Sequence, residues 1–194
     1  YGFDFDEFKT DNIGAGGALQ EGLADMSSFR GMSRYIAFFG RVMYNYDEKY
    51  LASVSLRRDG SSKFGADNKW GWFPAVSLGW RINKESWFEN TDWLSDLKLR
   101  AGFGVTGNQD FSSYKSLLLM DPFSFYYYDG KWVTSYAPAS NPNPDLAWER
   151  KNEFNVGLDF AFFDNRFGGT IDYYYRLTTN LLYNYTVPVP PYDY

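Results

Sequence analysis

Strict alternation with a period of two is the feature that most constrains this chain. In residues 72–82, large apolar residues occupy the even positions, and aromatic, small or charged residues occupy the odd ones. Successive side chains of a β-strand point to opposite faces, so this period predicts strands with one apolar face. The pattern recurs in six segments, which predict an all-β fold: 35–46, 50–57, 72–82, 97–106, 154–162 and 166–177.

Alternation alone also fits a one-sided sheet in a soluble sandwich. Two features favour a membrane wall instead. The less apolar face is rich in Gly, Ser, Arg and Asp, which suits a wet lumen, and each segment is near the ~9–11 residues that a tilted membrane strand needs. The apolar face carries aromatic residues near strand ends, where membrane barrels place aromatic girdles: Tyr44, Tyr46, Tyr50, Trp72, Trp80, Phe162 and Phe167. We therefore expect an antiparallel transmembrane β-barrel wall.

The composition limits the chemistry that this wall can perform. The chain has no Cys and no His, which removes thiolate chemistry, the commonest general base and the commonest metal ligand. Its net charge of -5 and its lack of a basic run argue against nucleic acid as a partner. Asp159 and Asp172 are a conceivable carboxylate pair, but we expect them to balance arginines on the same face. We predict no catalytic residue, no cofactor and no metal.

The connections between the predicted strands alternate in length, as in outer-membrane barrels. Residues 47–49 and 163–165 form tight turns, which we expect on the periplasmic side. Residues 83–96 lie on that side by parity, and Asn83–Phe88 predicts a capped helical turn at the membrane interface.

The long connections fall on the opposite, extracellular side. They are residues 59–71, residues 107–147 and the flanking pieces 1–33 and 179–194. Within 107–147, residues 123–128 and 131–136 predict a hairpin around Asp129-Gly130, and residues 114–120 a possible further strand. Asp59 is expected to cap a turn over 59–62 through its side chain.

The predicted organisation is one barrel domain made of successive wall and loop segments. Four wall strands lie in 34–106 and two in 148–178, giving about six to eight strands with the doubtful ones included. Neither end predicts a closing strand: the first 33 residues lack alternation, and Pro188, Pro190 and Pro191 lack backbone donors. Because a barrel must pair its last strand with its first, we expect a piece of a larger barrel. No signal peptide opens the chain.

Four blocks of sequence carry a family resemblance. They read KYLASVSLRRDGSSKFG over 49–65, WGWFPAVSLGWRI over 70–82, LKLRAGFGVTGNQ over 97–109, and NPDLAWE, NVGLD and TIDYYY between 143 and 175. In this order they resemble the SusC/RagA family of TonB-dependent outer-membrane transporters, over residues 34–110 and 141–190.

The resemblance implies a barrel of about 22 strands with a plugged lumen, in the cell outer membrane. It also implies an N-terminal plug, dependence on TonB, and pairing with a surface lipoprotein of the SusD kind. This chain shows neither plug nor TonB-contacting box. Residues 1–33 and 111–140 depart most from the shared pattern and are expected to vary with substrate.

Two sets of residues are candidates for function. The lumen-facing wall residues are predicted to be Arg57, Arg81, Arg100, Asp159 and Asp172; the arginines either steer an anionic solute or contact the plug, or they pair with wall carboxylates. The aromatic residues of the hairpin are candidates for contact with substrate or with a partner protein, because aromatic rings suit the C–H faces of sugars: Phe123, Phe125, Tyr126, Tyr127, Tyr128, Trp132 and Tyr136.

The leading hypothesis is TonB-dependent uptake of an oligosaccharide with a SusD-like partner. A peptide importer of the same family is the first alternative. A soluble or surface-anchored β-rich binding module is the alternative from another class.

Overall fold

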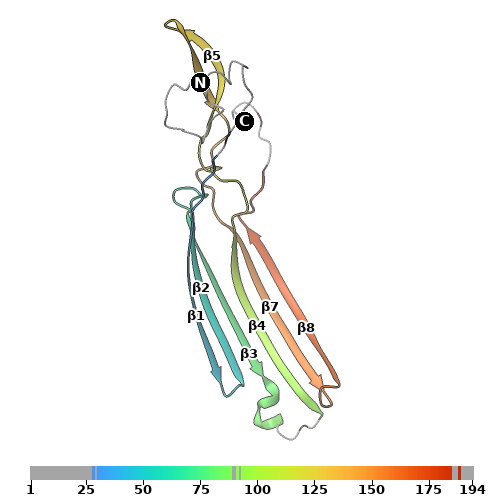
Figure 1. The fold of residues 1–194 in the computed structure, drawn as a ribbon. Helices are drawn as coiled ribbons and strands as arrows, with labels where there is room; N and C mark the ends of the chain where they lie inside the picture. Colours follow the sequence, from blue (N-terminus) through green and yellow to red (C-terminus); the bar gives the residue numbers. More distant parts are fainter. Residues whose placement is uncertain (1–27, 29, 89–90, 92, 185–187, 189–194) are drawn as a thin grey trace.

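A six-stranded antiparallel sheet forms the body of the molecule, in the order β1-β2-β3-β4-β7-β8 (Figure 1). The computed structural model describes residues 28, 30–88, 91, 93–184 and 188. The strands of this sheet are β1 (Tyr35–Tyr46), β2 (Tyr50–Ser61), β3 (Trp70–Arg81), β4 (Leu94–Asn108), β7 (Glu149–Phe162) and β8 (Phe167–Thr179). All six predicted strands are therefore confirmed, and most extend past their predicted bounds.

The register of the strands assigns every side chain of the sheet to one of two faces. One row of Cα partners runs straight across it: Val42, Val54, Val76, Phe103, Phe154 and Tyr175. The next row, one residue along, belongs to the other face: Met43, Ser53, Ser77, Gly102, Asn155 and Tyr174. One face is thus apolar from edge to edge. The other, which we call the polar face, is small or polar on its four central strands and carries Met43 and Tyr174 at its edges.

The sheet is a single layer. Two side chains near the middle of the apolar face, Leu78 and Phe103, are 54% and 44% exposed. A soluble sandwich would bury such residues between its two sheets, so the structure does not support the sandwich alternative. No helix among the described residues is both long and apolar enough to cross a membrane.

Aromatic residues of the apolar face gather at both ends of the strands. At one end Phe38 stacks on Trp70, and the Arg58 guanidinium lies over the rings of Trp70 and Trp72. At the other end the rings in contact are those of Tyr46 with Tyr50, and of Trp93 and Phe167 with Phe162. Two such bands are typical of barrels that cross a bilayer, and the predicted girdles are confirmed in position.

The short connections lie together at the lower end of the sheet in Figure 1. Asp47 and Glu48 turn the chain from β1 to β2, and residues 163–165 turn it from β7 to β8, all with positive φ. Between β3 and β4 the chain forms two 3₁₀ turns, η2 (Ile82–Lys84) and η3 (Ser86–Phe88). The expected side-chain cap is wrong: Arg81 precedes η2 and makes no capping hydrogen bond.

A separate hairpin rises beyond the opposite end of the sheet (Figure 1). Its strands are β5 (Met120–Tyr128) and β6 (Lys131–Pro138), joined at Asp129 and Gly130 with φ of 49° and 79°. Positive φ at both central residues is the geometry of the predicted two-residue turn. The possible further strand over 114–120 does not form: residues 114–117 are turns and a bend, and β5 begins only at Met120.

The two faces of β3 predict losses of stability of different size when a charged side chain is introduced. We expect Val76→Arg, in the middle of the apolar face, to lower the free energy of unfolding by about 2–4 kcal/mol because the charge would enter hydrocarbon. The matched variant Ser77→Arg, on the polar face, should cost less than about 1 kcal/mol, which is the hydrogen bond between Ser77 and Ser53. Urea unfolding of the whole barrel in lipid vesicles measures both, and equal losses would contradict the assignment.

Candidate functional site: polar wall and aromatic hairpin

The polar face is hollowed across the middle of the sheet. A groove of about 760 Å³ lies over β1, β2, β3, β4 and β7. Small residues of the polar face, Ser53, Ser77, Gly79, Gly102 and Gly104, are among those that line it, with Arg100, Glu153 and Asn155 at its β4–β7 side. The groove is therefore made by short side chains in the central rows and bounded by charged and amide groups.

Arg100 is the centre of a polar network on this face. Its Nε and Nη2 donate to the two carboxylate oxygens of Asp159, at 2.8 and 2.9 Å, and Nη2 also donates to Asp172 at 3.0 Å. The Thr170 hydroxyl donates to Asp159 at 3.0 Å. A two-pronged Arg–carboxylate pair is stronger and better oriented than a single contact, so this network fixes four side chains from three strands.

Gly157 leaves the space in which the network forms. A Cβ at this position would lie 2.3 Å from Asp172 Oδ1 and 2.7 Å from Arg100 Nη2. A larger residue would displace one of the two charged groups. Glycine in the middle of a strand weakens it, and here the close approach of the charged side chains gives the reason for its presence.

The other two predicted arginines also lie beside carboxylates. Arg57 Nη2 is 2.7 Å from Asp59 Oδ2, and Arg81 Nη1 is 3.7 Å from Glu48 Oε2. Cross-strand register places all five predicted wall residues on the polar face. Of the two interpretations of the arginines, the pairing with wall carboxylates is the one for which the structure shows contacts.

The carboxylate pair does not have the arrangement of a catalytic site. Asp159 and Asp172 are diagonal across β7 and β8, and both accept hydrogen bonds from the same guanidinium. Catalysis by a carboxylate pair needs one member as a proton donor, whereas here both accept hydrogen bonds from one guanidinium. The contacts thus support charge balance within the wall.

A small hydrophobic cluster closes the hairpin end of the sheet, and sequence reasoning missed it. Its buried members are Phe64, Phe73, Val105 and Trp148, with Phe111 and Leu146 packed against them. Phe64 is only 1% exposed and contacts Trp148 with ring centroids 4.4 Å apart. We call these six residues the clamp, because they bring together the β2–β3 loop and both ends of the long excursion from β4 to β7.

Backbone and side-chain hydrogen bonds hold the clamp together. The Gly65 amide donates to the Leu146 carbonyl at 3.0 Å, and the Asn68 amide group donates to the Asp145 carbonyl at 3.1 Å. Lys63 Nζ donates to the carbonyls of Gln109 and Phe111 at 3.3 and 2.7 Å. The loops thus behave as one packed unit at the base of the hairpin.

Asp59 belongs to β2 and not to a turn, so its predicted capping role is wrong. The strand continues to Ser61, and the Asp59 carboxylate is fully buried beside the Arg57 guanidinium. A buried charge is stable only with a partner, which explains why Arg57 lies next to it. The loop between β2 and β3 is correspondingly shorter than expected, residues 62–69.

The hairpin divides the predicted contact residues between two faces. Register pairs Tyr127 with Trp132 and Phe125 with residue 134, so these two pairs and Tyr136 share one face. Tyr126 and Tyr128 lie on the other, opposite Val133 and Lys131. The rings of Tyr127 and Trp132 meet edge to face at 5.4 Å, and both remain more than half exposed. We call the face with Phe125, Tyr127, Trp132 and Tyr136 the aromatic face. The side chain of Phe123 lies outside the described ones.

Comparison with known proteins identifies the family. The sequence profile of the family described as TonB dependent receptor-like, beta-barrel, matches residues 1–194. The chain belongs to this family of TonB-dependent receptor barrels. It is 40% identical over 154 residues to TonB-dependent receptor P39 of Formosa agariphila and 38% identical over 172 residues to TonB-dependent receptor SusC of Bacteroides thetaiotaomicron. These alignments cover 79% and 86% of the chain.

Solved structures of the same kind of barrel agree with the fold. The chain is 33% identical to a chain of "Structure of the RagAB peptide transporter", with a TM-score of 0.71 over 80% of its length. An "open-open" state of the RagAB peptide importer gives a TM-score of 0.73 over 80%. The resemblance to SusC and RagA relatives and the barrel fold are thus confirmed, and none of these relatives is named as an enzyme.

The chain spans a small part of each relative. It covers 14% of receptor P39, 17% of SusC and 17% of the RagAB chain. What it contributes to a TonB-dependent receptor barrel is a section of wall with its loops. Residues 1–27 and most of 185–194 lie outside the described residues, so the predicted loops at both ends stay predictions.

The packing of the clamp predicts that one methyl group added at Gly65 will disrupt the contact between its loops. A Cβ at Gly65 would lie 1.7 Å from the Pro144 carbonyl oxygen, a backbone atom that cannot swing away. We expect Gly65→Ala to separate loop 62–69 from residues 143–148 and to speed amide hydrogen exchange in both. Gly40→Ala is the matched control, because nothing lies within 4 Å of its added Cβ. Unchanged exchange in both loops of Gly65→Ala would contradict the clamp.

Proposed function

We propose that the protein imports an oligosaccharide across the outer membrane by TonB-dependent transport, with a SusD-like surface lipoprotein as its partner. The observation that carries the choice of substrate is the aromatic face of the hairpin. This chain supplies wall and extracellular loops, and the plug and the TonB contact belong to parts of the transporter that these residues do not include.

The hairpin offers the surface chemistry that binds sugars. Exposed Tyr127 and Trp132 present flat apolar rings, and tyrosine hydroxyls beside them can exchange hydrogen bonds with sugar hydroxyls. Charged residues within β5, β6 and their turn are few: Asp121, Asp129 and Lys131. A surface of rings and hydroxyls with little charge favours a neutral, hydroxyl-rich solute.

An apolar stretch beside the hairpin supports a protein partner. Four consecutive apolar residues lead into β5, and all of them are exposed: Leu117, Leu118, Leu119 and Met120. The two legs of the hairpin are joined there by the hydrogen bond from the Ala139 amide to the Leu119 carbonyl. Consecutive exposed apolar residues on an ordered loop mark an interaction surface, which a surface lipoprotein would cover.

The polar face supports a route for solute past the wall. Its central rows carry Ser and Gly, and Arg100, Asp159 and Asp172 pair with one another beside them. Small polar residues and paired charges suit a water-filled lumen through which a neutral sugar can pass. We propose that this face lines the lumen.

Peptide import is the second candidate, because one structural relative is itself described as a peptide transporter. Peptides bring charged termini and backbone donors and acceptors. The outer edges of β5 and β6 are unpaired within the described residues, since that sheet has only two strands. An extended peptide could add to such an edge, whereas a sugar would use the rings.

The two faces of the hairpin separate these candidates. We expect Tyr127→Ala/Trp132→Ala in the whole transporter to weaken binding of an oligosaccharide by at least about 1 kcal/mol, roughly fivefold. The matched control, Tyr126→Ala/Tyr128→Ala, removes two exposed rings from the opposite face and should change binding little. Calorimetry with a panel of glucose-, mannose- and galactose-based oligosaccharides measures both.

Other outcomes of that titration are equally informative. Binding of peptides from a tryptic digest in place of every oligosaccharide would replace the proposal with peptide import. Oligosaccharide binding that both double variants leave unchanged would remove the hairpin from the site.

A further inference from the structure

The segment between β3 and β4 leaves the sheet at the end where the short turns lie (Figure 1). Its two 3₁₀ turns are closed by the hydrogen bonds from the Glu85 amide to the Ile82 carbonyl at 3.0 Å and from the Phe88 amide to the Glu85 carbonyl at 2.8 Å. We call residues 82–88 the foot. Trp87, at its tip, is 66% exposed although it is among the largest apolar side chains of the chain.

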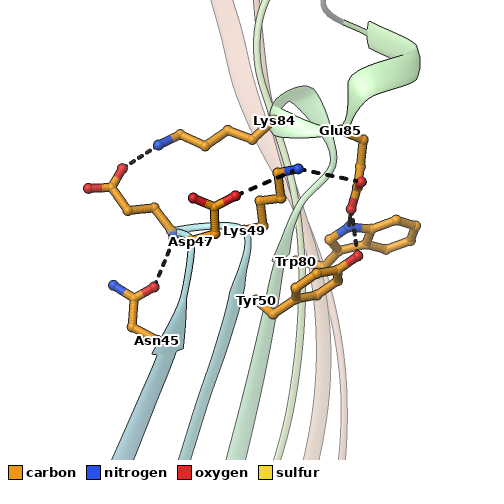
Figure 2. Close-up of polar contacts among 8 residues, drawn as sticks. Asn45, Asp47, Lys49, Tyr50, Trp80, Lys84 and Glu85 are labelled. Carbon is orange, nitrogen blue, oxygen red and sulfur yellow. Dashed lines mark hydrogen bonds and ion pairs between the residues drawn. The ribbon is translucent and has the colours of Figure 1, made fainter.

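Glu85 ties the foot to the apolar face of the wall. Its Oε1 accepts hydrogen bonds from the Tyr50 hydroxyl at 2.7 Å and from the Trp80 indole N–H at 3.0 Å, and all three side chains meet in Figure 2. Tyr50 and Trp80 are register partners on the apolar face. The carboxylate therefore draws the foot toward the side of the wall that faces lipid, away from the lumen.

Electrostatics strengthen this tie. The Tyr50 hydroxyl, followed by the Trp80 indole, lowers the pKa of Glu85, which keeps the carboxylate ionised. Lys49 Nζ is 4.0 Å from its other oxygen. Lys84 forms a second link, an ion pair with Glu48 in the β1–β2 turn (Figure 2). The foot is thus held on one flank by Glu85 and on the other by Lys84.

Just before β4, the chain returns to the apolar face of the wall. Trp93 stacks on Phe162 with ring centroids 5.6 Å apart, and Phe162 belongs to the apolar face. Trp93 is itself more than half exposed. The described end of the connection next to β4 therefore places a tryptophan beside the aromatic band at this rim.

We propose that the foot lies in the headgroup layer of the periplasmic leaflet, with Trp87 and Trp93 as its anchors and Glu85 as the positioning residue. Short turns mark the periplasmic end of such barrels, and the aromatic band at this rim is continuous with the lipid-facing surface. Tryptophan favours the membrane interface because its ring is apolar and its N–H is polar. The partner is the phospholipid bilayer, and the proposal is independent of the substrate.

Spin labels on single cysteines test the location. In the whole transporter in phosphatidylethanolamine–phosphatidylglycerol vesicles, with any cysteine outside this chain replaced, Trp87→Cys and Trp132→Cys are labelled in turn. They are matched, because Trp87 and Trp132 are 66% and 65% exposed. We expect the label at 87 to collide several-fold less with an aqueous nickel chelate than the label at 132, and more with dissolved oxygen.

Two results would overturn the proposal. A label at 87 as accessible to the nickel chelate as the label at 132 would put the foot in the periplasm, and one shielded from both reagents would put it against protein. Glu85→Ala should mobilise the label at 87, whereas Asp164→Asn, which neutralises a carboxylate in the β7–β8 turn of the same rim, should leave it immersed. A label equally immobile in both would remove the positioning role of Glu85. None of these outcomes bears on sugar binding.

Discussion

In-register pairing of six antiparallel strands is the constraint on which the rest of the structure depends. Because side chains alternate with a period of two, one register decides for a whole row whether it faces the apolar or the polar side. The row from Val42 to Tyr175 and the row from Met43 to Tyr174 differ by a single residue of shift. The first is apolar or aromatic throughout, whereas the four central members of the second are small or polar. A slip of one residue would place Arg100 in hydrocarbon.

The functional features lie at three levels along the strands of this sheet. The middle of the polar face carries the Arg100 network beside the groove. One end carries the clamp, which supports the hairpin and its aromatic face. The other end carries the foot, tied to the apolar face by Glu85. The wall therefore separates the end that we propose to face the ligand from the end that we propose to anchor in the membrane.

Sequence alone predicted the features that follow from local periodicity. Alternation and turn residues were enough to predict all six strands, the hairpin at Asp129-Gly130 and the two aromatic bands. They also predicted the face of the sheet on which five charged residues lie: Arg57, Arg81, Arg100, Asp159 and Asp172. Contacts between distant residues were not predictable in this way. The clamp joins Phe64 to Trp148, 84 positions apart. Asp59, which was expected in a loop, is instead a buried strand residue paired with Arg57. The register shift between Pro122 and Ser124 was not predicted either.

Cysteine scanning along β3 tests most directly whether one row of side chains meets lipid and the next meets water. Positions 74–79 are replaced one at a time in the whole barrel in its native membrane and treated with a water-soluble, charged maleimide. We expect labelling with a period of two. The odd positions should react because they share the polar face with Ser77, and the even positions should not because they share the apolar face with Val76. Labelling that ignores this period, or that favours the even positions, would contradict the account.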